Sequence, residues 1–318
     1  MKTITENTMS THALLRTAAL AGLFAGASAL AATPINETRP LSATGHVSVD
    51  NLKGSITVRT WDRPEVRITG SLGEGVEKLE IEGNAERLSI LVRYPQRSGW
   101  FNWGASQGEA STLELTIPAA AGLKASGVSA DIDVAGTGGA RLGLESVSGD
   151  LTVRGARAGE ASFESVSGNV DVEIDSRSTS AETVSGDLRL RGAIAGRVAL
   201  ESVSGDLGLR AGTVDRLEVS SVSGDADLQL ALAPGARVTA ETLSGNLTLR
   251  LPANASGRVQ AESFSGSIRS PVGEVVTEEY GPGSSLKGQL GDGSADLRLE
   301  TFSGDIRIST GSASASDK

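Results

Sequence analysis

Four stretches of the sequence repeat one another almost letter for letter: ESVSGDLTVR at 145–154, ESVSGNVDVE at 164–173, ETVSGDLRLR at 182–191 and ESVSGDLGLR at 201–210. They share the motif Glu-Ser/Thr-Φ-Ser-Gly-Asp/Asn, where Φ is apolar. Complete or close copies of the motif place their glycines at Gly149, Gly168, Gly186, Gly205, Gly224, Gly245, Gly266 and Gly304. Successive glycines lie 19, 18, 19, 19, 21, 21 and 38 residues apart, and the last interval equals two periods of 19. Such a constant period indicates a repeat architecture.

Apolar residues around each glycine follow a period of two, which is the pattern of a β-strand. They stand two and four positions after the glycine, as in Leu151 and Val153, and two positions before it, as in Val147. A second apolar series lies five and seven positions before the glycine. The alternation between the two series slips by one residue at the Glu-Ser/Thr pair. We therefore expect both residues of that pair to point outward at a bend, and the Φ residues to lie with the core series.

These patterns predict an all-β protein, a single-stranded parallel β-helix (β-solenoid) with about 19–21 residues per coil. Each coil would contain two strands, and in-register stacking about 4.8 Å apart would align equivalent side chains in columns. A helix would repeat its apolar residues at three and four positions, and an antiparallel sandwich would not need nearly identical units.

The repeat glycines are interpreted as structural turn residues. A side chain there would crowd the bend, or the backbone would need a positive φ. The Asp or Asn that follows can bond backbone donors of the turn, and the Ser before the glycine can form a ladder of hydroxyls.

The N-terminus has the pattern of a secretory signal peptide, which we assign to residues 1–31. Lys2 and Arg16 supply positive charge, residues 17–30 are apolar and Ala-rich, and Ala29 and Ala31 form a small-x-small cleavage pattern. The apolar run is shorter than the ~18 residues that a transmembrane helix needs, and no second such run follows. We expect an exported chain without a transmembrane segment after cleavage, most readily in the periplasm, with the cell surface or secretion as alternatives.

The remaining chain divides by the regularity of its repeats. We expect an extended leader at 32–42, an irregular β region at 43–122 that caps the solenoid, regular repeats at 123–309 and a disordered tail at 310–318. The segment from Pro271 to Asp292 falls where one copy is skipped, and we interpret it as a decorated or distorted coil.

Composition excludes several classes of function. The net charge of −10 and the pI of about 4.9 argue against a nucleic-acid partner, which requires a basic face. The chain has no cysteine, so it has no disulfides, no thiolate metal site and no thiol for a lipid anchor.

The motifs also resemble a known family. The reiterated ESVSGD and ETVSGD strings, the segment WDRPEV at 61–66, and YGPG at 280–283 before a last TFSGDIRI are similar to the bacterial putative-adhesin β-strand-repeat family, an adhesin-like domain of unknown function. The resemblance covers nearly the whole chain after the signal peptide. It implies a right-handed β-helix in an exported bacterial protein, and it brings no catalytic residues.

No catalytic or metal-binding constellation stands out from the repeats. A stacked column of acidic residues, including Glu145, Glu164 and Glu201, could bind calcium, but arginines five positions after the glycines could pair with carboxylates instead. We expect no cofactor, with calcium as the less favoured alternative. A polysaccharide-degrading enzyme is disfavoured because every carboxylate belongs to a repeated column, whereas an active site should interrupt the repeat.

One irregular segment, residues 96–111, contains the aromatic residues Trp100, Phe101 and Trp103. These rings could plug the end of the solenoid or form an exposed lip for a glycan or protein partner, and they are our candidate binding residues. The sequence thus favours a non-enzymatic, adhesin-like interaction or scaffold module that binds an envelope protein or glycan. A structural solenoid that self-associates end to end is the alternative.

Overall fold

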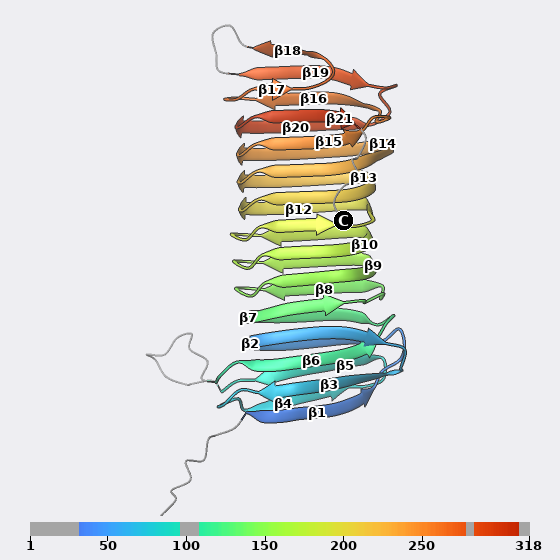
Figure 1. Ribbon diagram of the computed structural model, residues 1–318, viewed down its shortest axis with the longest axis vertical. Coiled ribbons are helices and arrows are strands. Elements are labelled where there is room, and N and C mark those ends of the chain that lie inside the picture. The colour runs from blue at the N-terminus through green and yellow to red at the C-terminus, as the bar shows by residue number, and fades with distance from the viewer. Residues whose placement is uncertain (1–31, 96–107, 278–282, 312–318) are drawn as a thin grey trace, which may run out of the picture. The chain divides into compact units, whose positions relative to one another are not determined.

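The protein is a stack of β-coils (Figure 1). The computed structural model describes residues 32–95, 108–277 and 283–311, and every regular element in these ranges is a strand. In chain order the strands are β1 (Thr33–Pro40), β2 (His46–Trp61), β3 (Glu65–Leu72), β4 (Lys78–Gly83), β5 (Arg87–Arg93), β6 (Ser111–Pro118), β7 (Gly122–Ala135), β8 (Arg141–Ser146), β9 (Leu151–Ser165), β10 (Val170–Thr183), β11 (Leu188–Arg191), β12 (Ile194–Ser204), β13 (Leu207–Ser223), β14 (Ala226–Ser244), β15 (Leu247–Pro252), β16 (Gly257–Ser263), β17 (Ile268–Arg269), β18 (Glu274–Thr277), β19 (Ser284–Leu290), β20 (Asp296–Ser303) and β21 (Ile306–Gly311).

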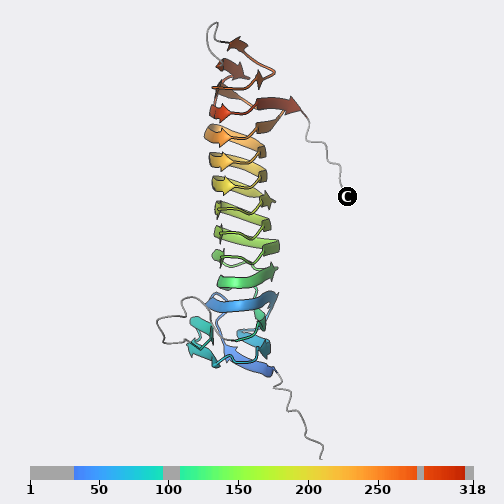
Figure 2. The same cartoon turned by 90° about the vertical axis from the view of Figure 1, so that its left-hand side faces the viewer.

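Equivalent residues of neighbouring coils pair in parallel. Val170 of β10 pairs with Leu151 on one side and with Leu188 on the other. On the opposite layer of the same coil, Ala181 pairs with Phe163 and with Leu200. Register shifts are confined to the bend between the two layers, for example between Val172 and Ile174. The repeat motifs of neighbouring coils are therefore aligned. Figure 2 shows the coils stacked one above another.

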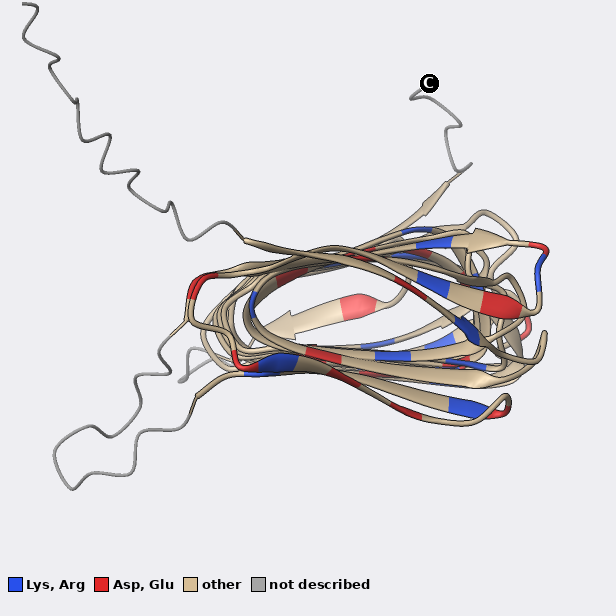
Figure 3. Ribbon diagram, turned by 90° about the horizontal axis from the view of Figure 1, so that it is seen from below, with Lys and Arg blue, Asp and Glu red and all other residues tan. Residues whose placement is uncertain are grey.

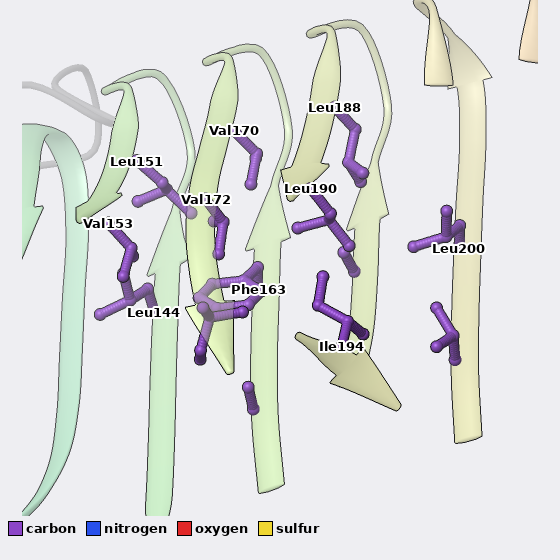
Figure 4. Packing of buried hydrophobic residues seen from close by; sticks show 14 of the residues in the cluster. Leu144, Leu151, Val153, Phe163, Val170, Val172, Leu188, Leu190, Ile194 and Leu200 are labelled. Carbon is purple, nitrogen blue, oxygen red and sulfur yellow. The ribbon is translucent and has the colours of Figure 1, made fainter. Parts of the chain in front are cut away.

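A narrow apolar core fills the space between the two layers. Leu151, Val170 and Leu188 form one row, and Leu144, Phe163 and Leu200 lie across from it, all of them 0–1% exposed (Figure 4). Burying such a side chain contributes roughly 1.5–3 kcal/mol relative to leaving it in water. The core series two and four residues after the repeat glycine, and the series five and seven residues before it, point inward as the sequence indicates.

The residues just before each glycine are arranged differently from the sequence prediction, which is wrong at this point. The Ser or Thr three positions before the glycine is buried, as in Ser165 and Thr183, while Val166 and Val184 are 42% and 43% exposed. Ser165 explains the exchange, because its hydroxyl accepts a hydrogen bond from Gly168 N at 3.0 Å and donates one to Gly168 O at 2.8 Å. The inward hydroxyl satisfies backbone groups that an apolar side chain would leave unpaired, so Φ turns to solvent.

The repeat glycines are required by close packing of the coils. A Cβ built on Gly186 would lie 2.1 Å from the carbonyl oxygen of Gly168, and one on Gly168 would lie equally close to Gly149 O. Backbone atoms cannot yield as a flexible side chain would. Of the eight repeat glycines, only Gly205 and Gly224 also have a φ in the range that side chains disfavour, at 151° and 137°. Crowding is thus the general cause, and positive φ is a local addition.

At the N-terminal end, the first coil in sequence is not the outermost coil. Strand β2 pairs in parallel with β5 and β6 on one side and with β7 on the other. Strands β4 and β3 pair antiparallel with β5 and β6, and β1 pairs antiparallel with β3. A coil formed by β5 and β6 therefore lies outside the coil formed by β2, and antiparallel strands cover it.

The C-terminal end repeats this arrangement. Strand β20 pairs in parallel with β14 and β16, and β21 pairs in parallel with β15 and β17. The last coil in sequence is thus inserted between the coils that contain Gly245 and Gly266. The expectation of a distorted coil at 271–292 is wrong, because β18 and β19 pair antiparallel with each other and β19 pairs antiparallel with β16. This arrangement accounts for the 38-residue interval before Gly304.

Candidate binding groove

The exposed Φ residues, together with Val128 at the equivalent position of the coil before the first motif, form a continuous row along one corner of the stack. In stacking order this apolar ladder is Val128, Val147, Val166, Val184, Val203, Val222, Leu243, Phe302 and Phe264, with exposed fractions between 41% and 53%. Main-chain bonds hold the row in register, because Ser167 N donates to Val147 O at 2.8 Å and Ser185 N donates to Val166 O at 2.9 Å. The side chains grow from Val through Leu to Phe along the stack. At the far end the rings of Phe264 and Phe302 are stacked, with their centroids 4.7 Å apart.

A row of carboxylates runs beside the apolar ladder, two residues earlier in each coil. In stacking order this glutamate ladder is Glu145, Glu164, Glu182, Glu201, Glu241, Glu300 and Glu262, with Ser220 between Glu201 and Glu241. On the other side of the apolar ladder lies a row of exposed serines, among them Ser148, Ser204 and Ser244. The corner therefore presents an apolar strip between carboxylates and hydroxyls.

The corner is hollowed into two cavities that continue one another. One cavity of about 560 Å³ is lined by Glu164, Val184 and Val203 among others, and one of about 590 Å³ is lined by Leu243, Phe264 and Phe302 among others. Ser220 and Val222 line both cavities. Together they form a groove along the glutamate and apolar ladders, which we call the ladder groove.

Most of the glutamate ladder lacks neutralising partners. Lys124 Nζ lies 2.6 Å from Glu145 Oε1, which raises the pKa of Lys124, and Arg298 pairs with Glu300. Within the ranges that the structure describes, the other five glutamates of the ladder form no ion pair. Like charges repeated about every 4.8 Å repel one another, so the corner carries uncompensated negative potential.

The outer surface of the opposite layer is neutralised by comparison. Arg191 Nη1 lies 2.7 Å from Asp171 Oδ1 of the preceding coil, and Arg250 pairs in the same way with Asp227. Partial burial acts to raise the pKa of Asp133, but bonds from Arg154 and Arg59 outweigh it and hold the pKa below its usual value. Viewed along the stack, blue and red segments are intermixed on the strands of both layers (Figure 3).

The Asp/Asn column forms a ladder of side chain to backbone bonds, and this Asp/Asn ladder runs through all the repeats. Oδ1 of each member accepts the backbone N–H of the equivalent residue in the next coil, at 2.8–3.1 Å, from Asp131 through Asp150, Asn169, Asp187, Asp206, Asp225 and Asn246 to Asp305. Asp305 accepts from Ser267 N and Ser267 Oγ, which lower its pKa. No group of three or more His, Asp or Glu able to hold a metal ion occurs among the described residues.

The candidate residues from the sequence fall in different places. Trp100, Phe101 and Trp103 lie outside the described residues, as do residues 1–31 and 312–318. The two ends of the segment that carries the aromatic residues are joined by a buried polar cluster, in which Tyr94 Oη bonds Asn51 Oδ1 at 3.1 Å and lies 3.2 Å from Ser111 Oγ. Sequence reasoning missed this cluster, and it also missed the ladder groove because it placed the Φ residues in the core.

Stacked side-chain ladders and an open groove along the coils define an all-β repeat protein. The chain belongs to the Toastrack DUF4097 family, whose model matches residues 45–309. This match confirms the resemblance to adhesin-like repeat domains of unknown function. No curated protein matches the sequence.

One solved structure supports the fold assignment. The chain is similar to a putative lipid binding protein from Parabacteroides distasonis, with a TM-score of 0.51 and 12% identity over 87% of this chain and 97% of that one. It also matches a putative adhesin from Bacteroides fragilis, with a TM-score of 0.41 and 13% identity over 88% and 99% of the two chains. At these identities the likeness concerns the fold alone. In the described part of the chain, no helix has the length and hydropathy needed to cross a bilayer.

Proposed function

We propose that the protein is an exported, non-enzymatic interaction or scaffold module of the bacterial cell envelope, with the periplasm as its compartment. The signal-peptide pattern at residues 1–31 supports export. We also infer a right-handed coil, because connections between parallel strands of one sheet are right-handed in roughly 98% of cases. A binding role is favoured over catalysis because the groove is built from equivalent positions in successive coils, whereas an active site should interrupt the repeat.

The ladder groove is the observation that carries this proposal. Soluble proteins rarely leave an ordered apolar strip in solvent unless it contacts a partner. Nine apolar residues form this strip, one from each successive coil. The strip therefore results from the repeated motif and not from a single exposed residue. The coils beneath it are held by backbone pairing on both sides, so the groove is preorganised and binding costs little ordering entropy.

Fractionation and cross-linking in cells test the proposal. The full-length chain is expressed with a photo-cross-linking residue at Val203, and the control carries it at Arg210, five residues after Gly205 on the opposite layer. We expect periplasmic recovery after removal of residues 1–31, and a cross-linked partner at position 203 that position 210 does not give. Retention in the cytoplasm with an intact N-terminus, or the absence of cross-links from both positions, would contradict the proposal.

A further inference from the structure

We propose that the ladder groove binds a basic amphipathic α-helix of a partner protein, with the apolar face of the helix on the apolar ladder and its Lys or Arg residues on the glutamate ladder. This inference rests on the proposed interaction role and names the class of partner. The one occupant that the groove favours is both apolar and cationic, because an apolar strip and unpaired carboxylates run side by side.

Charge complementarity is the first argument. Glu164, Glu182 and Glu201 occupy successive coils without an ion pair in the described structure, whereas Asp171 and Asp227 on the opposite layer are both bound by arginine. Arginine therefore neutralises these two aspartates, whereas the three glutamates in the middle of the ladder are left for a partner to neutralise. An acidic or neutral partner would leave the glutamate ladder unpaired, and a strongly anionic lipid headgroup would be repelled by it.

Spacing is the second argument. The rungs of the ladder lie about 4.8 Å apart, and an α-helix lying along the stack repeats its apolar face about every 5.4 Å. The mismatch is about 0.6 Å per rung, so a helix of four turns stays within about half a rung of register. An extended strand repeats one face about every 6.8 Å and loses register after two rungs. The groove thus fits a helix better than a strand.

The lateral arrangement gives the helix an orientation. Glu201 and Val203 are two residues apart on one strand, so their side chains project from points about 6–7 Å apart. An amphipathic helix places charged residues at a similar distance from the centre of its apolar stripe. The residue that follows the apolar ladder in the coil of Val203 is an exposed serine, Ser204, and not a carboxylate, so basic residues are needed on one flank of the stripe only. The partner is therefore expected to be basic on one side of its apolar face.

A synthetic peptide of about 14 residues, built from Leu and Lys with an apolar stripe at helical spacing, tests the inference on the intact protein. We expect micromolar binding by fluorescence anisotropy, a gain of helicity by circular dichroism, and weaker binding as salt rises. The same peptide with Glu in place of Lys should not bind. Equal affinity for a single-chain cationic detergent in monomeric form would assign the groove to small amphiphiles and overturn the inference.

Two pairs of surface variants locate the binding. Val184→Ser with Val203→Ser, and Glu182→Gln with Glu201→Gln, should each weaken binding at least about five-fold, which is what the loss of two partly exposed contacts gives. The matched control, Asp171→Asn with Asp227→Asn, removes the same charge from the opposite layer. It should leave the affinity for the peptide within about two-fold of the wild-type value, because screened charges far from the groove change long-range attraction only slightly. Equal loss in the control, or no loss in the ladder variants, overturns the inference.

The same experiments separate this inference from the proposed function. If the peptide fails to bind while the chain still cross-links an envelope partner, the interaction role stands and the helix assignment is wrong. If sedimentation shows a dimer that Val203→Ser dissolves, the groove is an interface between two copies and the helix assignment is again wrong. Failure of both the peptide and the cross-link contradicts the interaction role itself.

Discussion

The backbone N–H of Asp305 donates a hydrogen bond of 3.0 Å to Oδ1 of Asn246, a residue 59 positions earlier in the chain. Elsewhere in the Asp/Asn ladder the partners are 18, 19 or 21 residues apart. The long step arises because the last coil in sequence lies between two coils that precede it. This hydrogen bond therefore follows the same pattern as the other repeats, and its long sequence separation shows that the last coil is inserted out of sequence order.

Replacing a repeat glycine should destabilise the stack. In Gly186→Ala the new Cβ would meet Gly168 O at 2.1 Å, so the coils must separate locally, and we expect a loss of about 2–4 kcal/mol in the free energy of unfolding. Gly208→Ala is the control, because its Cβ would find ordinary contacts at 3.7 Å. Denaturant unfolding compares the two, and equal stabilities would contradict the crowding argument.

The buried hydroxyls should matter more than the exposed ones. Ser165→Ala removes both bonds to Gly168 and leaves a backbone N–H without that partner, so we expect a cost of about 1–3 kcal/mol. Ser167→Ala changes an exposed serine two residues away and should stay within about 0.5 kcal/mol of the wild type. Ser165→Thr should retain stability, because Thr183 makes the same two bonds in the next coil.

The apolar ladder should contribute little to folding. Val203→Ser alters a side chain that is 48% exposed, and we expect a change within about 0.5 kcal/mol. Leu200→Ala, three residues earlier, empties a fully buried site and should cost about 2–5 kcal/mol. Thermal melts of both variants compare the contributions of the exposed Val203 and the buried Leu200 to stability. A large loss from Val203→Ser would mean that the Φ residues belong to the core after all.

Acid should weaken the N-terminal coil through His46. Burial, followed by the charges of Arg87, Arg141 and Lys124, lowers the pKa of His46 in the folded protein. Below about pH 6.5 the unfolded chain takes up a proton that the folded state resists, so the free energy of unfolding falls as pH decreases from 7 towards the folded pKa. The measurement is unfolding of wild type and His46→Gln at pH 7 and pH 5.5. His46→Gln should lose less stability between these values, and identical losses would exclude this role of His46.

Internal and terminal coils should respond differently to deletion. Removing residues 187–205 joins Gly186 to Asp206 in the same motif, and we expect a folded stack shortened by one coil. Removing residues 294–318 takes away β20 and β21, which separate β14 and β15 from β16 and β17, and should unfold the C-terminal end. Circular dichroism and limited proteolysis compare the two deletions. A well-folded product from the terminal deletion would contradict the inserted coil.

The period of the repeats predicts much of this fold because each coil uses the same contacts. Leu151, Val170 and Leu188 occupy equivalent positions in the motif, and parallel pairing places them side by side. The corner was harder to predict, because Ser165 and Val166 are adjacent and hydrophobicity alone assigns the valine to the core. The hydrogen-bonding needs of Gly168 reverse that choice. A short hydroxyl residue at an invariant distance of three from the glycine was the available signal.

The order of coils at the two ends could not be read from the sequence. Gly304 carries the same motif as Gly266, and nothing local distinguishes a coil that is added last from one that is inserted. The choice depends on long-range pairing, in which β16 exchanges one parallel neighbour for the antiparallel strand β19. The charge of the groove could not be predicted for a related reason, because it depends on which arginines contact which carboxylates in the folded stack.

The inserted end coils have a mechanical consequence. A force that pulls on the chain beyond β21 does not reach an outermost coil that could peel away, because β20 is bound on one flank to β14 and on the other to β16. The load must shear two rows of hydrogen bonds at once. At the opposite end β2 is held between β5 and β7 in the same manner. Tension applied on the C-terminal side would therefore meet resistance in the body of the protein, whereas β1 on the N-terminal side is paired along one edge with β3 and would peel away first.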